Sequence, residues 1–218
     1  MKRILCYGDS NTWGYDPEDE YGPGICGRFP ADVRWTGVMQ NLLGPSYCVL
    51  EEGLNGRTTV YDDAGAYGRN GLMHLEVAIR TCDPVDLIIL MLGTNDAKDD
   101  FHASIHGITN GMARLIRTCH AVLPYTRSGQ AKILVAAPLK VIADQNGAYQ
   151  YGFSALSTEK GEGLRNAYRE LAQLTGCAYF DVNDHVEAGL VDGVHLDAAG
   201  HRVLGKALAE TVRNLMEQ

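Results

Sequence analysis

The stretch from Val85 to Leu92 is almost continuously apolar, with Asp86 as its one interruption. It is too short to cross a bilayer as a helix, which takes about 20 apolar residues. It also lacks the alternation of a strand that is half exposed to water. A short apolar run of this kind is typical of a strand buried on both faces, as in a parallel sheet. Such a sheet requires helices on both of its faces.

The rest of the chain supplies the other strands and the helices in alternation. The expected strands are Arg3–Tyr7, Tyr47–Leu50, Val85–Leu92, Lys132–Ala136 and Ala178–Val182. The expected helices, judged by apolar residues at three- and four-residue steps, are Val33–Leu43, Gly71–Thr81, Ser104–Leu123, Thr158–Thr175 and Asp197–Met216. This order predicts an α/β three-layer sandwich with a central five-stranded parallel sheet and helices on both faces. Without a linker or repeat, we expect residues 1–218 to form a single domain.

Composition narrows the classes of partner. The formal net charge of -8 argues against nucleic acid or an anionic membrane as the main partner, since both attract basic surfaces. No apolar segment is long enough for a membrane span, and the start of the chain does not resemble a signal peptide. The six cysteines are scattered without a C-x-x-C pair, which favours reduced thiols and a cytoplasmic protein and gives no zinc-binding spacing.

Polar and glycine-rich segments follow four of the expected strands. They are Gly8-Asp9-Ser10, Gly53-Leu54-Asn55-Gly56, Gly93-Thr94-Asn95-Asp96 and Asp192-Gly193-Val194-His195. All strands of a parallel sheet end at the same edge, where ligands bind in such folds. The order of the strands therefore predicts that these segments meet in space. The two long irregular stretches, Asp16–Arg28 and Lys140–Ser157, are expected to form walls around them.

The residue types in these segments suit acyl transfer. A serine hydroxyl needs a base, and a carboxylate on the other ring nitrogen orients that base. Ser10 is the candidate nucleophile, His195 the base and Asp192 its orienting acid. The developing oxyanion needs donors already in place, for which the backbone N–H groups of Ser10 and Gly56 and the side-chain amide of Asn95 are candidates. Nearby residues that could line a substrate pocket are Trp13, Tyr15, Thr94, Phe153 and Val194.

These four segments resemble the sequence blocks of the SGNH (GDSL-type) hydrolase superfamily, which has a flavodoxin-like fold. Longer strings, such as Arg3–Gly14 and Met91–Asp96, resemble a bacterial arylesterase and acyltransferase subgroup. Three features depart from the family pattern. Asn11 stands where leucine is common, Glu51 stands where many members have asparagine, and Lys140–Ser157 is the least similar part.

The resemblance implies a serine esterase without a cofactor. Its expected substrates are small-molecule, short-chain, acetyl-type esters of aryl or alkyl alcohols, with acyl transfer to alcohols as a further activity. Carbohydrate acetates are an alternative within the same fold. The subgroup also implies a homo-oligomer, a dimer or larger.

Two hypotheses of other classes remain. A metal-dependent phosphoesterase could use Asp9, Asn95, Asp96, Asp192 and His195 as ligands, but Ser10 would then have no role. A non-catalytic binding protein on the same fold is the second. It would have no need for the serine, asparagine, aspartate and histidine together.

Overall fold

The computed structural model describes residues 1–22 and 25–217. Five parallel strands form the central sheet in the order β4-β1-β5-β6-β7. Their bounds are β1 Lys2–Gly8, β4 Tyr47–Gly53, β5 Leu87–Met91, β6 Lys132–Ala137 and β7 Ala178–Asp181. Each of the five expected strands is present within a few residues of its expected bounds.

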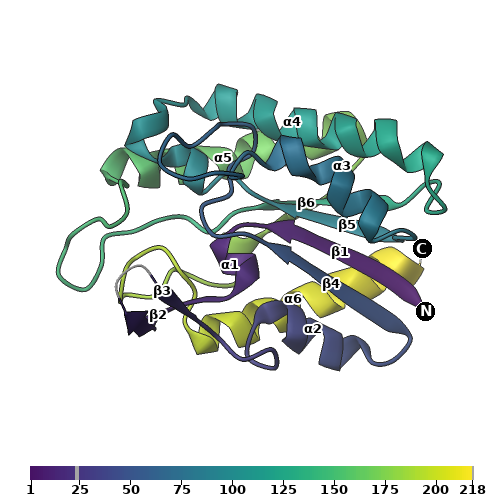
Figure 1. Cartoon of the computed structure of the whole chain (residues 1–218), viewed down its shortest axis with the longest axis horizontal. Coiled ribbons are helices and arrows are strands. Elements are labelled where there is room, and N and C mark those ends of the chain that lie inside the picture. The colour runs from purple at the N-terminus through teal and green to yellow at the C-terminus, as the bar shows by residue number, and fades with distance from the viewer. Residues whose placement is uncertain (23–24, 218) are drawn as a thin grey trace.

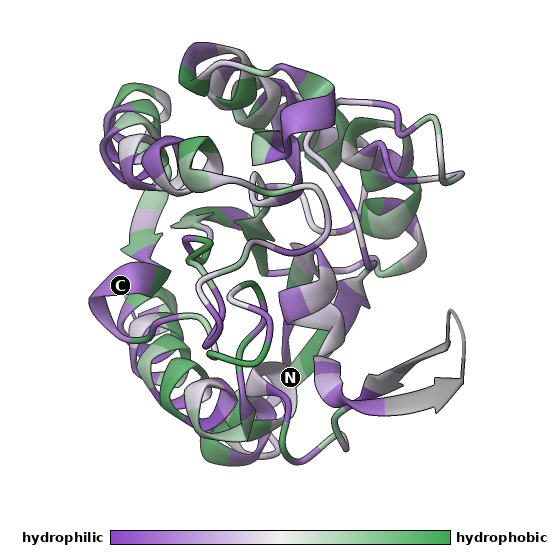
Figure 2. Cartoon of the chain, turned by 90° about the vertical axis from the view of Figure 1, so that its left-hand side faces the viewer, coloured by the Kyte–Doolittle hydropathy of each residue, from purple (hydrophilic) through white to green (hydrophobic). Residues whose placement is uncertain are grey.

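Helices cover both faces of this sheet (Figure 1). On one face lie α3 (Gly71–Thr81), α4 (Ile105–Val122) and α5 (Ala155–Thr175). On the other face lie α2 (Trp35–Leu43) and α6 (Ala198–Glu217). Figure 2 shows that these helices have a hydrophobic and a hydrophilic side, as expected for helices that lie between a sheet and water. The predicted three-layer α/β fold is confirmed.

The two sides of the sheet pack into two separate hydrophobic clusters. Alternate residues of β1 point in opposite directions, so that Leu5 and Tyr7 pack with α3, α4 and α5, whereas Ile4 and Cys6 pack with α2 and α6. Every residue of β5 is buried. The apolar run at Val85–Leu92 is therefore explained by burial on both faces.

The neighbouring strands β4, β1 and β5 end at one level. Gly8 at the end of β1 pairs with Gly53 of β4 on one side and with Met91 of β5 on the other. The short helix α1 (Ser10–Trp13) packs directly against this edge. A side chain at Gly53 would collide with the backbone of Trp13, at 2.2 Å from its nitrogen. Glycine at this strand end lets the serine-bearing turn lie close against the sheet.

Several local features differ from the expectation. The described part of Asp16–Arg28 is not irregular, since β2 (Tyr15–Gly22) and β3 (Ile25–Arg28) pair antiparallel in a separate two-stranded sheet. Helix α2 starts at Trp35 and not at Val33, because the backbone N–H groups of Val33 and Arg34 bond to Pro30 in a preceding turn. Helix α5 starts three residues early, at Ala155, behind a capping box formed by Ser154 and Ser157.

Candidate active site

Ser10, His195 and Asp192 form a continuous chain of hydrogen bonds at the carboxyl edge of the sheet. The Oγ of Ser10 lies 2.8 Å from Nε2 of His195, and Nδ1 of His195 lies 2.6 Å from Oδ2 of Asp192. Ser10 begins α1, directly after β1, whereas Asp192 and His195 lie in the loop before α6. All three side chains are buried. The strand order thus brings together residues at opposite ends of the chain.

The Asp192 carboxylate is held by the loop that carries His195. Its Oδ1 accepts hydrogen bonds from the backbone N–H groups of Val194 (2.9 Å) and His195 (3.0 Å). Burial alone would raise the pKa of Asp192, but the hydrogen bonds and charge of His195 and these backbone donors outweigh it and lower that pKa. Asp192 is therefore ionised at neutral pH and can stabilise a positive charge on the imidazole.

The candidate oxyanion donors lie beside the serine. Gly56 follows β4 and has a φ of 77°, a left-handed conformation that favours glycine. The amide Nδ2 of Asn95, which follows β5, donates to the carbonyl of Arg57 at 3.1 Å. An amide has two N–H groups. This bond uses one of them and orients Asn95, and the second N–H remains as the candidate donor to the oxyanion. Ser10, Gly56 and Asn95 line the same cavity.

This catalytic cavity has a volume of about 140 Å³. Tyr15, Phe153 and Val194 line it, as expected, together with Ser10 and His195. Trp13 and Thr94 are not among the described residues that line it, which corrects the expectation for both. The short helix α1 turns Trp13 away from the cavity, and its ring lies under the guanidinium of Arg28 instead. Thr94 is buried and its hydroxyl faces the carbonyl of Leu139.

Three residues of the cavity wall were not predicted. Asn55 lies within the expected Gly53–Gly56 block, Lys98 lies two residues after the Gly93–Asp96 block, and Tyr151 lies in the Lys140–Ser157 segment near Phe153. The ring of Tyr15 stacks on the imidazole of His195, with centroids 4.1 Å apart, and Tyr151 meets that imidazole edge-on. Proximity to the blocks could have indicated Asn55 and Lys98. The stretch Lys140–Ser157 was expected to form a wall, but nothing in the sequence singled out Tyr151 within it.

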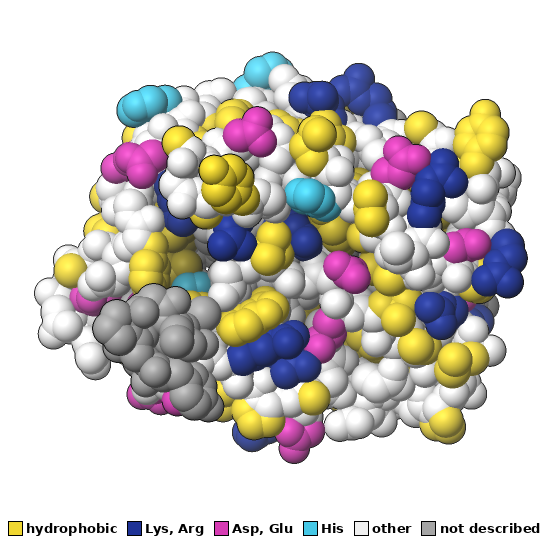
Figure 3. Space-filling view, viewed as in Figure 1, with side chains coloured by type: hydrophobic (Ala, Val, Ile, Leu, Met, Phe, Trp, Pro, Cys, Tyr) yellow, Lys and Arg dark blue, Asp and Glu magenta, His cyan; other side chains and the backbone are white. Residues whose placement is uncertain are grey.

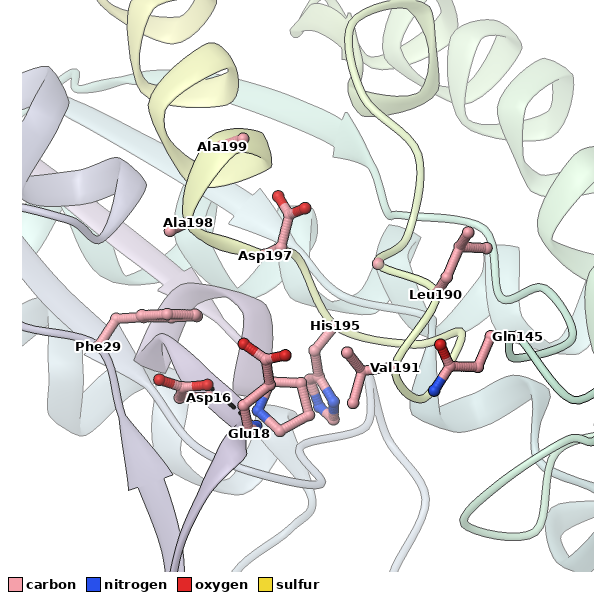
Figure 4. A pocket seen from close by; sticks show the side chains of 12 residues that line it. Asp16, Glu18, Phe29, Gln145, Leu190, Val191, His195, Asp197, Ala198 and Ala199 are labelled. Carbon is pink, nitrogen blue, oxygen red and sulfur yellow. Dashed lines mark hydrogen bonds between the residues drawn. The ribbon is translucent and has the colours of Figure 1, made fainter.

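A second and larger hollow of about 400 Å³ also reaches His195. Figure 4 shows its wall, with the carboxylates of Asp16, Glu18 and Asp197 and the amide of Gln145. The ring of Phe29 forms part of the same wall. This hollow is therefore more polar and more acidic than the cavity beside Ser10.

Two carboxyl groups are buried beneath the serine. Burial raises the pKa of Asp9 to about 7 and that of Asp96 to about 6. The backbone N–H and hydroxyl of Thr59 donate to Asp96, whereas Oδ2 of Asp9 has no hydrogen-bond partner among the described residues. Both side chains are inaccessible from the cavity and do not line it. Asp9 and Asp96 are therefore part of the structure that supports the catalytic residues.

Within residues 1–22 and 25–217, no group of three His, Cys, Asp or Glu side chains is arranged to hold a metal ion. No helix in the described part of the chain has the length and hydrophobicity to span a bilayer. On the face shown in Figure 3, acidic and basic side chains are interspersed.

The chain is similar to known proteins in both sequence and fold. The model of the GDSL-like lipase/acylhydrolase family matches residues 6–203. An aryl esterase from M. smegmatis is 38% identical, with a TM-score of 0.91 over 99% of this chain and 100% of that one. The carbohydrate acetylesterase Est24 from Sinorhizobium meliloti is 35% identical, with a TM-score of 0.88 over 99% and 100% of the two chains. A search of curated proteins found no match.

The sequence blocks, the parallel sheet and the hydrogen-bonded serine, histidine and aspartate agree with these comparisons. The family match covers most of the chain and includes the Ser10, Asn95 and His195 segments. The chain belongs to the GDSL-like lipase/acylhydrolase family and is a carboxylic ester hydrolase of the SGNH fold.

Proposed function

We propose that the enzyme hydrolyses short-chain, acetyl-type esters of aryl or alkyl alcohols through an acyl-enzyme on Ser10. The observation that carries this proposal is the hydrogen-bonded Ser10–His195–Asp192 chain beside a cavity of about 140 Å³. Pockets for drug-sized ligands measure roughly 300–1,000 Å³, so a cavity of this size favours a small acyl group. Most of the described side chains in its wall are uncharged, with Lys98 as the cationic exception, which favours an uncharged acyl group.

The reaction has two steps. Oγ of Ser10 attacks the ester carbonyl while Nε2 of His195 takes the hydroxyl proton, and Asp192 stabilises the imidazolium. The oxyanion accepts hydrogen bonds from the N–H groups of Ser10 and Gly56 and from Asn95. The intermediate then expels the alcohol, which His195 protonates. Water, deprotonated by the same histidine, attacks the acyl-enzyme and releases the acid. An alcohol in place of water gives acyl transfer.

The geometry favours this mechanism over the metal-dependent phosphoesterase. That hypothesis needs a free ring nitrogen on His195, but one nitrogen faces Ser10 and the other faces Asp192. It also leaves the serine without a role.

The test is hydrolysis of p-nitrophenyl acetate, butyrate and octanoate in the presence of EDTA. We expect kcat/KM to fall with chain length, and Ser10→Ala to reduce turnover by about 10⁴-fold or more. Loss of wild-type activity on adding EDTA, or equal activity of both proteins, contradicts the proposal. Carrying out the reaction in water–methanol mixtures and measuring methyl acetate quantifies acyl transfer.

A carbohydrate acetylesterase is a second candidate. The hollow that reaches His195 presents three carboxylates, an amide and an aromatic ring, which are groups that hydrogen-bond to and stack on sugars. Release of acetate from acetylated xylan or glucose pentaacetate at a kcat/KM above that for p-nitrophenyl acetate favours this candidate. A lower value favours simple aryl or alkyl esters.

A further inference from the structure

The side chain of Asn11 joins the serine segment to the histidine loop. Its Nδ2 donates to the backbone carbonyl of Val194 at 3.2 Å, and its Oδ1 accepts from the backbone N–H of Leu196 at 2.9 Å. These two backbone groups flank His195, and Asn11 directly follows Ser10. One amide group therefore fixes the distance between the two segments on both sides of the imidazole.

The surroundings hold this amide in a single place. Asn11 is 3% exposed. Its backbone carbonyl accepts from the indole of Trp35 at 3.0 Å, and its backbone N–H donates to Asp9 at 3.0 Å. Val194 and Leu196 are also buried. A buried backbone group that loses its partner is left unsatisfied and destabilises the fold, so these bonds are hard to give up.

Leucine, the residue common at this position in the family, could not make either bond. It has neither a donor for the Val194 carbonyl nor an acceptor for the Leu196 N–H. This departure from the GDSL pattern is therefore matched by two hydrogen bonds that only an amide side chain of this length provides here.

We propose that Asn11 is a positioning residue that holds His195 within hydrogen-bonding distance of Ser10. The proposal rests on the serine mechanism above. Asn11 does not line the catalytic cavity, so it acts through the backbone on either side of His195. Both steps of the reaction need the imidazole at the serine, and a displacement of about 1 Å can cost about 100-fold in rate.

The chain contains a matched control. The side chain of Asn183 donates from Nδ2 to the carbonyl of Pro138 at 3.0 Å and accepts at Oδ1 from the N–H of Lys140 at 2.8 Å. This is the same pair of bonds to residues i and i+2, made away from Ser10 and His195. Asn183 is partly buried and its Nδ2 also donates to Asp181 at 3.0 Å, so replacing it removes a tie of the same kind and measures the general structural cost of such a loss.

The experiment measures kcat and KM for p-nitrophenyl acetate, together with Tm, for wild type, Asn11→Leu, Asn11→Asp, Asn183→Leu and Ser10→Ala. Each protein is assayed below its own unfolding transition. We expect Asn11→Leu to lower kcat by about 10- to 100-fold while KM changes by no more than about twofold. Asn183→Leu is expected to lower Tm and to leave kcat within about twofold of wild type. Asn11→Asp keeps the acceptor but loses the donor, so its loss of kcat should be intermediate.

The positioning role is contradicted if Asn11→Leu keeps kcat within about twofold of wild type, or if Asn183→Leu loses as much kcat as Asn11→Leu. If Asn11→Leu does not fold, the same comparison is made with Asn11→Asp. Ser10→Ala separates the two proposals. If this variant keeps wild-type activity, the serine mechanism fails. If it is inactive while the Asn11 variants keep kcat, only the positioning role fails.

Discussion

The floor and the walls of the site are built in different ways. The floor consists of Ser10, Asn95, Asp192 and His195, which follow strands or precede a helix and are fixed by buried hydrogen bonds. The walls come from β2 and from the segment before α5, and they meet mainly through rings. The hydroxyls of Tyr15 and Tyr151 are 3.4 Å apart, and Tyr151 is 49% exposed. This difference indicates that the sheet edge determines the chemistry, whereas β2 and the segment before α5 determine which ester fits.

The largest effect is expected from Asp192→Asn, which tests whether the floor works as a unit. An amide can donate to His195 Nδ1 and so favour the tautomer that cannot accept the serine proton. We expect kcat for p-nitrophenyl acetate to fall by about 10⁴-fold with little change in Tm. A loss below about tenfold would show that Asp192 is not needed to orient the base.

Asn95→Ala removes one donor of the floor and leaves the serine and its base in place. We expect kcat to fall by about 10²–10³-fold with KM nearly constant, because the donor acts mainly on the oxyanion. Steady-state kinetics with p-nitrophenyl acetate checks this. An increase in KM at constant kcat would instead place Asn95 among residues that bind the ground state.

The contribution of Asp9, which is buried beneath the floor, to the free energy of unfolding should depend on pH. Asp9 has a pKa of about 7 in the native state because it is buried, against about 4 for an unfolded chain. The native state therefore keeps a proton between these values that the unfolded state has lost. Asp9 thus reduces the free energy of unfolding as pH rises from about 4 to about 7, by at most about 1.4 kcal/mol per pH unit.

Asp9→Asn removes this titration, so the free energy of unfolding of the variant should decline less over that pH range than that of wild type. Urea denaturation at pH 5 and pH 7.5 gives both values. Parallel declines for the two proteins would show that Asp9 is ionised in the native state throughout.

The smallest effect is expected in the wall. Phe153 is almost fully buried and lines the catalytic cavity, so Phe153→Ala should enlarge the space for the acyl group. We expect the ratio of kcat/KM for p-nitrophenyl butyrate over acetate to rise about fivefold, since one or two methylene groups are worth about 1–3 kcal/mol. The exposed Leu174→Ala on α5 is the control. An unchanged ratio would place the acyl group elsewhere.

The sequence predicted the floor better than the walls for a physical reason. Buried strands are visible in the sequence as apolar runs. The residues that follow parallel strands must meet at one edge of the sheet. This logic placed Ser10, Asn95, Asp192 and His195 together. It could not place Trp13, because a four-residue helix after Ser10 sets the direction of that side chain. Nor could it show the β2–β3 pairing, since Asp16–Arg28 lacks the alternation of a half-buried strand.

The role proposed for Asn11 illustrates a second limit. Its two side-chain bonds join residues 183 and 185 positions apart, and no local pattern reports such contacts. The sequence showed only that the residue differs from leucine. The homo-oligomer, the cytoplasmic location and acyl transfer to alcohols stay predictions.

The most direct test of the serine mechanism is covalent labelling with a p-nitrophenyl phosphonate, in the presence of EDTA. Such esters form a stable tetrahedral adduct on an activated serine. We expect intact-mass measurement to show one adduct on wild type, peptide mapping to place it on Ser10, and Ser10→Ala to remain unlabelled. Labelling of another residue, or equal labelling of Ser10→Ala, would contradict the mechanism.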